Sequence, residues 1–246
     1  MVIHPGLRIA ETDLVAAITP LMLKDSQENP SDFFAAICWS LICEPGDSFA
    51  GLLISSFGAA NALVLELERT SPNKYLSLLR EKENSGIERF RSFEKVAADA
   101  RQRWAPRMNL RRVVEACHDM ARLGGWFATS EHHAWPERLL DLEKHAPRGL
   151  WGLGERSAFD GLSDSFSFVG SRISTEYGQS ACADLIEPLV ARGSVIVSGG
   201  AYGIDASAHR AAIATGGLTV AMMAGGLDRL YPSGNAELFG SIRKRG

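Results

Sequence analysis

Apolar residues recur at two different spacings along the chain, and the change in spacing divides it into two parts. Up to about residue 105 they recur every three or four positions, which is the spacing of amphipathic helices. From about residue 165, short apolar runs alternate with helical stretches, and each run ends in glycine. The pattern predicts a helical domain with its linker over residues 1–105 and an α/β domain over residues 106–246.

The first part contains three predicted helices and an arginine-rich stretch. The helices are expected from Ser31, as the cap, to about residue 44, then over 48–54 and over 59–69. Residues 87–103 follow with helical spacing and many arginines, which indicates a solvated helix or a linker.

The second part alternates strands with helices. Strands are predicted over 166–169, 195–197 and 219–223, and helices over about 175–192 and 205–215. Apolar strands that alternate with helices are typical of a parallel sheet with helices on both faces. Upstream, an apolar stripe over 110–121 predicts a helix that ends at Gly124-Gly125, and two short strands are expected on either side of a helix that begins at Pro136.

Glycine follows each of the three predicted strands, which suggests a binding site. The glycines are Gly170, then Gly199 and Gly200, then Gly225 and Gly226. Carboxyl ends of parallel strands share one edge of the sheet, where ligands bind, and the helices that follow direct unpaired N–H groups there. Arg172 follows Gly170-Ser171 and would add a cationic fork for phosphate. Turns from strand to helix need glycine in any case, but three in register with an arginine favour an anion site.

The turn Ser198-Gly199-Gly200-Ala201-Tyr202-Gly203 and the helix after it hold further candidates. Asp205 and His209 are four residues apart and share a helical face, so they can form an acid–base pair. Alternatively, Asp205 caps the helix and orients the glycine turn, which we favour, and His209 is its hydrogen-bonded neighbour; for His209 both interpretations stay open. Tyr202 can stack on a nucleobase or pack beneath the turn.

Several enzyme classes are excluded by the absence of their motifs. No lysine follows a glycine, so there is no P-loop, and no tyrosine has a lysine four residues on, as short-chain dehydrogenases require. There is no Gly-x-Ser-x-Gly motif and no metal-ligand spacing. The sequence predicts a protein that is not an enzyme, without catalytic residues, cofactor or metal.

Composition and charge limit the class of protein, its binding partners and its cellular location. The 246 residues are 46% apolar with a net charge of −3, which excludes a disordered chain. Basic residues concentrate in 69–112, with twelve against five acidic, and 20 of the 26 basic residues are arginine; this suits nucleic-acid contact, although a GC-rich genome also produces it. We expect no membrane association, a cytoplasmic location and reduced, buried thiols, since the N-terminus lacks a signal-peptide pattern and the four cysteines form no Cys-x-x-Cys pair.

Three blocks of the last third resemble the DNA-processing protein A (DprA, or Smf) family. They are Phe168-Val169-Gly170-Ser171-Arg172, then the stretch from Ser198 to His209, then Ala224-Gly225-Gly226-Leu227-Asp228-Arg229-Leu230-Tyr231-Pro232. A weaker resemblance extends upstream through Trp135-Pro136 and Trp39-Ser40-Leu41-Ile42. It implies a Rossmann-like parallel sheet preceded by a small all-α, sterile-alpha-motif-like domain.

The resemblance also implies a function. Members of the family bind single-stranded DNA, protect it during natural transformation and load the RecA recombinase onto it. Their phosphate pocket corresponds here to Gly170, Ser171, Arg172, Ser198, Gly199, Gly200 and Gly203. Many relatives have arginine where this chain has Tyr202, so one phosphate contact is replaced by stacking or is lost.

Relatives also continue beyond the position of Ile242-Arg243-Lys244-Arg245-Gly246 with further strands and a basic segment. We therefore expect a truncated chain with an incomplete sheet, and a homodimer that the truncation puts in question. Two alternatives stay open: a nucleotide-processing enzyme similar to phosphoribohydrolases, whose Pro-Gly-Gly-x-Gly-Thr loop is absent here, and an inactive remnant.

Overall fold

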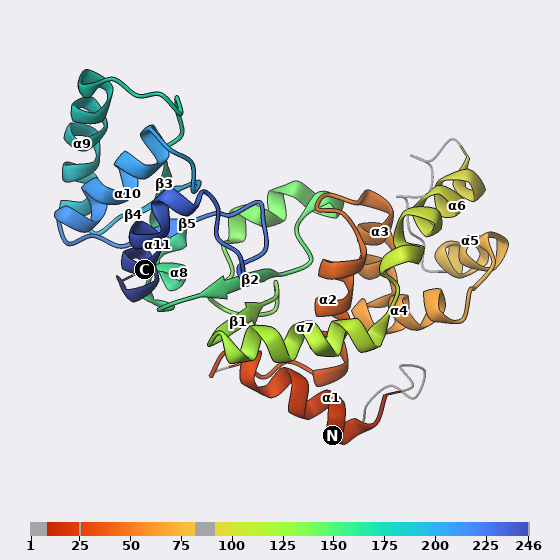
Figure 1. Ribbon diagram of the computed structural model, residues 1–246. Coiled ribbons are helices and arrows are strands. Elements are labelled where there is room, and N and C mark those ends of the chain that lie inside the picture. The colour runs from red at the N-terminus through yellow and green to blue at the C-terminus, as the bar shows by residue number, and fades with distance from the viewer. Residues whose placement is uncertain (1–8, 25, 82–91, 246) are drawn as a thin grey trace. The chain divides into compact units, whose positions relative to one another are not determined.

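The computed structural model describes residues 9–24, 26–81 and 92–245 (Figure 1). By its internal contacts the chain divides into two compact units. The first comprises Met1–Arg122, Trp126–His132 and Glu137–Leu150, and the second comprises Leu123–Gly125, His133–Pro136 and Trp151–Gly246. The boundary predicted at residue 105 falls inside the first unit, which includes the helix expected to open the second domain.

The first unit is mainly helical. Its helices are α1 (Glu11–Ile18), η2 (Thr19–Leu21), α2 (Pro30–Ile42), α3 (Ser48–Phe57), α4 (Ala59–Leu67), α5 (Pro72–Glu81), α6 (Phe93–Trp104), η4 (Ala105–Arg107), α7 (Leu110–Arg122) and η5 (Glu137–His145). The helices predicted over 31–44, 48–54, 59–69 and 110–121 are confirmed, whereas α1 and α5 were not predicted. The arginine-rich stretch is helical from Phe93 onward, and its residues 87–91 lie outside the described residues.

Two helix starts show how the sequence sets local structure. The predicted cap Ser31 is wrong: Asn29 caps α2, and its side chain accepts the Ser31 N–H at 2.8 Å. Pro30 is the reason, because its fixed φ suits the first helical position and starts the helix two residues earlier than predicted. At α3 the Asp47 carboxylate accepts the N–H groups of Phe49 and Ala50.

The same Asp47 also ties α3 to α6. Its carboxylate accepts the Trp104 indole N–H at 3.0 Å and pairs with Arg103 at 2.8 Å. The Trp104 ring is fully buried and meets Trp39 of α2 edge-on, with 5.3 Å between ring centroids. Aromatic packing and one buried carboxylate thus join three helices of the first unit.

Two short strands flank η5, as predicted. They are β1 (Gly125–Ala128) and β2 (Leu150–Leu153). The helix predicted between them is a 3₁₀ helix, and it is broken at Glu143, whose φ is +50°.

The second unit contains a parallel three-stranded sheet, as the alternating pattern predicted. Its elements are α8 (Ser157–Asp160), η6 (Leu162–Asp164), β3 (Ser165–Ser167), α9 (Glu176–Ala191), β4 (Val195–Ser198), α10 (Ile204–Ala214), β5 (Thr219–Ala221), η7 (Ser233–Asn235) and α11 (Ala236–Arg245). The strand order is β3-β4-β5, and Ile196 pairs with both Phe166 and Thr219. β3 and β5 end two residues earlier than predicted, and α11 was not predicted.

Helices α9, α10 and α11 pack on the same face of the sheet. Ile196 packs in a core with α9 and α10. Ala221 of β5 packs against a second core formed by α10 and α11. Ile196 and Ala221 point to the same side, because Thr219, the register partner of Ile196, is two residues from Ala221. The connections β3–α9–β4 and β4–α10–β5 both step to the next strand in the same direction across the sheet. Right-handed crossovers in one direction place their helices, α9 and α10, on the same face.

All four cysteines are free and buried, which confirms the expectation from their spacing. Burial raises the pKa of the Cys43 and Cys117 thiols to about 12. These thiols therefore stay protonated and unreactive near neutral pH.

Among the described residues, no single helix is both long and apolar enough to cross a membrane. Helices α3 and α4 reach the length and apolar composition of a membrane span only when taken together, and the chain bends by 113° between them.

Candidate functional site

The predicted glycine turns all leave the sheet at its carboxyl edge. Gly170 lies three residues beyond β3, Gly199 and Gly200 directly follow β4, and Gly225 and Gly226 lie beyond β5. The strands are parallel and adjacent, so these turns share one edge of the sheet. The structure thereby gives this edge the topology that the sequence predicted.

The turn after β3 is fastened to the start of α10. The Ile204 N–H donates to the Ser171 carbonyl at 3.0 Å. Gly203 has a φ of +80°, and a Cβ there would lie 2.1 Å from the same carbonyl oxygen. A Cβ at Gly170 would lie 2.8 Å from the Ile204 side chain. Two glycines therefore permit the close approach of the two turns.

Arg172 lies on this fastened turn, yet its side chain is free. The residue is exposed, and its guanidinium makes no hydrogen bond or ion pair with any residue that the structure describes. α9 begins four residues later, where the Thr175 hydroxyl accepts the Gly178 N–H, and α10 begins against Ser171. The starts of helices carry unpaired N–H groups and the positive end of the dipole. A free cation beside two helix starts is chemically suited to an anion.

Ser171 and Ser198 use their hydroxyls within the fold. The Ser171 hydroxyl donates to the Ile173 carbonyl at 2.8 Å and accepts the Ile173 N–H, which shapes the exposed turn. Ser198 is 3% exposed, and its hydroxyl donates to the Phe168 carbonyl at 2.5 Å. The Ser198 hydroxyl thus ties the ends of β3 and β4 together.

Asp205 supports the turn after β4. Gly203 is the residue that caps α10, without a side-chain hydrogen bond, and Asp205 lies at the second helical position. The Asp205 carboxylate accepts the Ala201 N–H at 3.3 Å, and a Cβ at Gly199 would lie 2.5 Å from it. Asp205 therefore orients the glycine turn from inside the helix, and the capping that we expected of it falls to Gly203.

His209 is fully buried, with both ring nitrogens in hydrogen bonds. One nitrogen lies 2.8 Å from the Gly199 carbonyl and the other 2.7 Å from the Thr219 hydroxyl. Burial lowers the pKa of His209, and the hydrogen bond to Gly199 and the charge of Asp205 oppose that change only in part. The imidazole links the turn after β4 to β5 and offers no free nitrogen to a substrate.

Asn235, which the sequence analysis missed, holds the same turn from the other side. Its side chain is 2% exposed and donates to the carbonyls of Gly200 and Ala201 at 3.0 and 3.2 Å. Tyr202 is half exposed, and its hydroxyl would lie 2.5 Å from a Cβ at Gly234. The run Ser233-Gly234-Asn235 before an amphipathic helix signals a turn, but its partners lie 34 and 35 residues away and cannot be read from it.

The turn after β5 is less enclosed by neighbouring residues than the turns after β3 and β4. A Cβ at Gly200 would lie 2.8 Å from the Met223 sulfur, so this turn begins next to the turn after β4. Gly225 and Gly226 are exposed, and open space surrounds the position of a Cβ at Gly225. The closest approach between turns is therefore between those after β3 and β4.

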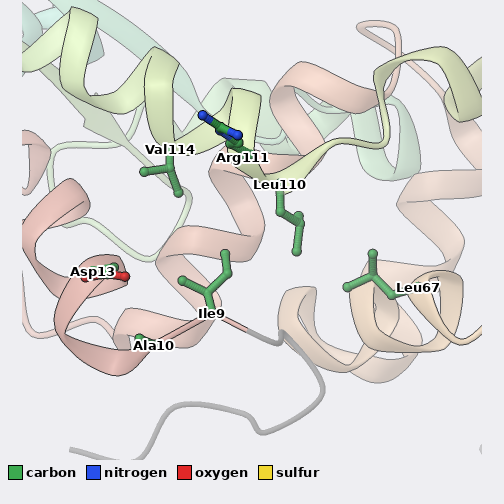
Figure 2. A pocket seen from close by; sticks show the side chains of 7 residues that line it. All are labelled: Ile9, Ala10, Asp13, Leu67, Leu110, Arg111 and Val114. Atoms are coloured by element: carbon green, nitrogen blue, oxygen red, sulfur yellow. The ribbon is translucent and has the colours of Figure 1, made fainter.

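Other features of the described residues do not point to a competing site. No group of three or more His, Cys, Asp or Glu among them could hold a metal ion. A cavity of about 450 Å³ in the first unit is lined by Ile9, Ala10, Asp13, Leu67, Leu110, Arg111 and Val114. The side chains of Ile9, Leu67 and Leu110 reach into it (Figure 2). None of these residues was predicted to belong to a site.

The known proteins to which this chain is similar are DNA-processing proteins. Residues 126–246 match the family model described as DNA recombination-mediator protein A. A DprA relative in Mycobacterium tuberculosis is 34% identical over 161 residues, which cover 61% of this chain and 41% of the relative. The DNA processing protein DprA of Bacillus subtilis is 40% identical over 117 residues, covering 48% and 38%, and Protein Smf of Escherichia coli is 33% identical over 128 residues, covering 49% and 33%.

A solved structure has the same fold. The X-ray structure of DNA processing protein A from Streptococcus pneumoniae aligns with a TM-score of 0.57 at 21% identity, covering 87% of this chain and 64% of that one. The matched regions span about two fifths or less of the length of the relatives named above.

Proposed function

Because this chain belongs, over residues 126–246, to the DNA-processing protein A (DprA/Smf) family, we propose that it binds single-stranded DNA at the turns after β3 and β4. The observation that carries the proposal is Arg172, an exposed guanidinium without a partner among the described residues. Gly170 and Gly203 hold its turn against the start of α10. A DNA-processing role in recombination follows from the proposal.

Each part of the edge has a different task in this proposal. Arg172 and the backbone N–H groups at the starts of α9 and α10 bind phosphate. The glycines let the strand approach the backbone, while Ser198, Asp205 and His209 fix the turns from within. Contacts of this kind read charge and not bases, so binding is weakly sequence-dependent and sensitive to salt.

The role is binding and not catalysis in this proposal. The strongest candidate for an acid–base group, His209, is buried and has both ring nitrogens engaged. The partners and setting follow from the family: strand protection during transformation, loading of RecA, a homodimer and a cytoplasmic location. The Rossmann-like sheet and the sterile-alpha-motif-like helical domain belong to the same proposal.

The test is the salt dependence of binding to oligo-dT by the parent chain and by Arg172→Ala. We expect Arg172→Ala to weaken binding to all sequences alike and to reduce the slope of log K against log salt by about 0.7, the contribution of one phosphate contact on a single strand. Arg210→Ala is the matched control, because it removes an exposed arginine farther along α10. Arg172 is exposed and unpaired, so the folded stability of its variant should change by less than about 0.5 kcal/mol.

Two outcomes would overturn the proposal. In the first, Arg172→Ala binds oligo-dT as tightly as the parent at every salt concentration, or the parent does not bind at all. In the second, the protein releases free base from nucleoside monophosphates and His209→Ala abolishes the release, which would indicate the nucleotide-processing enzyme.

A further inference from the structure

The connection between β3 and α9 exposes three large apolar side chains around Arg172. Val169, Ile173 and Tyr177 are 78%, 90% and 83% exposed. Single exposed apolar residues are common on protein surfaces, but three within nine residues, on either side of an unpaired cation in the sequence, leave much apolar surface on this connection for a ligand to cover.

The charges along this connection indicate what kind of ligand group each position suits. Arg172 suits a phosphate. Tyr177 lies in the first turn of α9, five residues after Arg172, and its ring carries no charge. The face of a nucleobase carries no net charge and stacks well on a tyrosine ring. The connection thus offers a phosphate position followed by a base position, as a single strand requires.

Tyr177 is better placed for stacking than Tyr202, the aromatic residue that the sequence singled out. The Tyr202 hydroxyl and ring atoms lie 2.5 to 3.2 Å from the position of a Cβ at Gly234, so η7 covers part of that ring. Tyr202 is 50% exposed against 83% for Tyr177. More of Tyr177 than of Tyr202 is therefore open to a ligand.

We propose that a base of the bound strand stacks on Tyr177, with Ile173 as the adjoining apolar contact, while Arg172 holds the neighbouring phosphate. This inference rests on the proposed binding of single-stranded DNA and adds the position of a base to it. It explains why apolar side chains stay exposed on the turn that carries the free cation.

The experiment compares two oligomers with the same number of phosphates: oligo-dT and an abasic oligomer that has only the sugar–phosphate chain. We expect Tyr177→Ala to weaken oligo-dT binding about tenfold, which corresponds to the usual contribution of one base–aromatic stack. Its binding to the abasic oligomer and its salt slope should equal those of the parent. Tyr177→Phe keeps the ring and should bind oligo-dT normally.

Leu185→Ala is the matched control, because it removes another exposed apolar side chain from α9, 62% exposed and two turns farther along. It should bind both oligomers like the parent. A 5-iodouracil oligomer should also crosslink to Tyr177, identified by mass spectrometry of the digested complex.

Failure of this inference and failure of the proposed function look different. If the parent and Leu185→Ala bind, Arg172→Ala binds weakly and Tyr177→Ala binds oligo-dT like the parent, the stacking is refuted and the phosphate site stands. Equal losses on both oligomers would also refute stacking. If Tyr177→Ala instead changes only the sedimentation of the protein, the apolar surface joins two copies of the chain, and the inference is wrong. If the parent binds neither oligomer, both proposals fall together.

Discussion

The turns after β3 and β4 lie side by side at one edge of the sheet but are built in opposite ways. The turn after β4 is held by three buried side chains, Asp205 and His209 of α10 and Asn235 of η7. The turn after β3 is fastened to α10 mainly through backbone, and it carries the exposed side chains of Arg172 and Ile173. The turn after β4 therefore supplies rigidity, and the turn after β3 supplies the groups that face solvent.

Separating the two turns should have the largest effect. Gly203→Ala would place a Cβ 2.1 Å from the Ser171 carbonyl oxygen at a φ of +80°, so the turns would have to move apart. We expect the free energy of unfolding to fall by about 3 kcal/mol or more, from backbone strain and from the lost approach. Urea denaturation followed by circular dichroism measures it.

Gly216→Ala serves as a comparison variant that has a positive φ without a clash. Gly216 has the same φ of +80°, but nothing lies within 4 Å of its Cβ position. Its variant should lose only about 1 kcal/mol, the cost of the backbone conformation. Equal losses for the two variants would mean that the close approach of the turns contributes nothing.

Removing the Asn235 side chain from the turn after β4 should have an intermediate effect on stability. Asn235→Ala removes two hydrogen bonds and leaves the Gly200 and Ala201 carbonyls without this buried donor. We expect a loss of about 2 kcal/mol in thermal or urea unfolding. Asn61→Ala removes an exposed amide that donates to the Phe57 carbonyl and should cost less than about 0.5 kcal/mol. A loss no larger than that of the control would show that Asn235 does not hold the turn.

The smallest expected effect is on the pH dependence of stability, and it tests the contact of His209 with the turn after β4. Burial lowers the pKa of His209, so below the ordinary value of 6.5 the unfolded chain binds a proton that the folded protein resists. Stability from this group is therefore present above pH 6.5 and is lost as the pH falls, at no more than about 1.4 kcal/mol per pH unit.

Urea midpoints measured between pH 7.5 and 5.5 check this expectation. His209→Gln should be less stable than the parent at pH 7.5 but should show a flatter decline toward pH 5.5. His118→Gln, which changes an exposed histidine of α7, should keep the decline of the parent. A parent-like decline in His209→Gln would show that another group causes it.

The spacing of apolar residues along the chain predicted most of the helices and strands. The apolar stripe from Leu110 predicted α7, and the alternation after residue 165 predicted β3, β4, β5 and the helices between them. Helices α5 and α11 were not predicted, although each carries an apolar stripe. Both are polar overall, and the burial of their stripes depends on partners far away in the sequence, such as Ala206 for α11. The sequence pattern likewise could not show that α9, α10 and α11 share one face, because that follows from strand order.

The roles of the site residues divide in the same way. The sequence by itself determined where the strands end, that glycine occupies the turns, and that an arginine follows the first of them, since these depend on neighbouring residues. Only the tertiary structure decided that Ser198 and His209 point into the fold, that Asn235 reaches Gly200, and that Arg172 and Tyr177 stay open to solvent. The physical reason is that burial and hydrogen-bond partners depend on segments tens of residues apart, which come together only when the sheet forms.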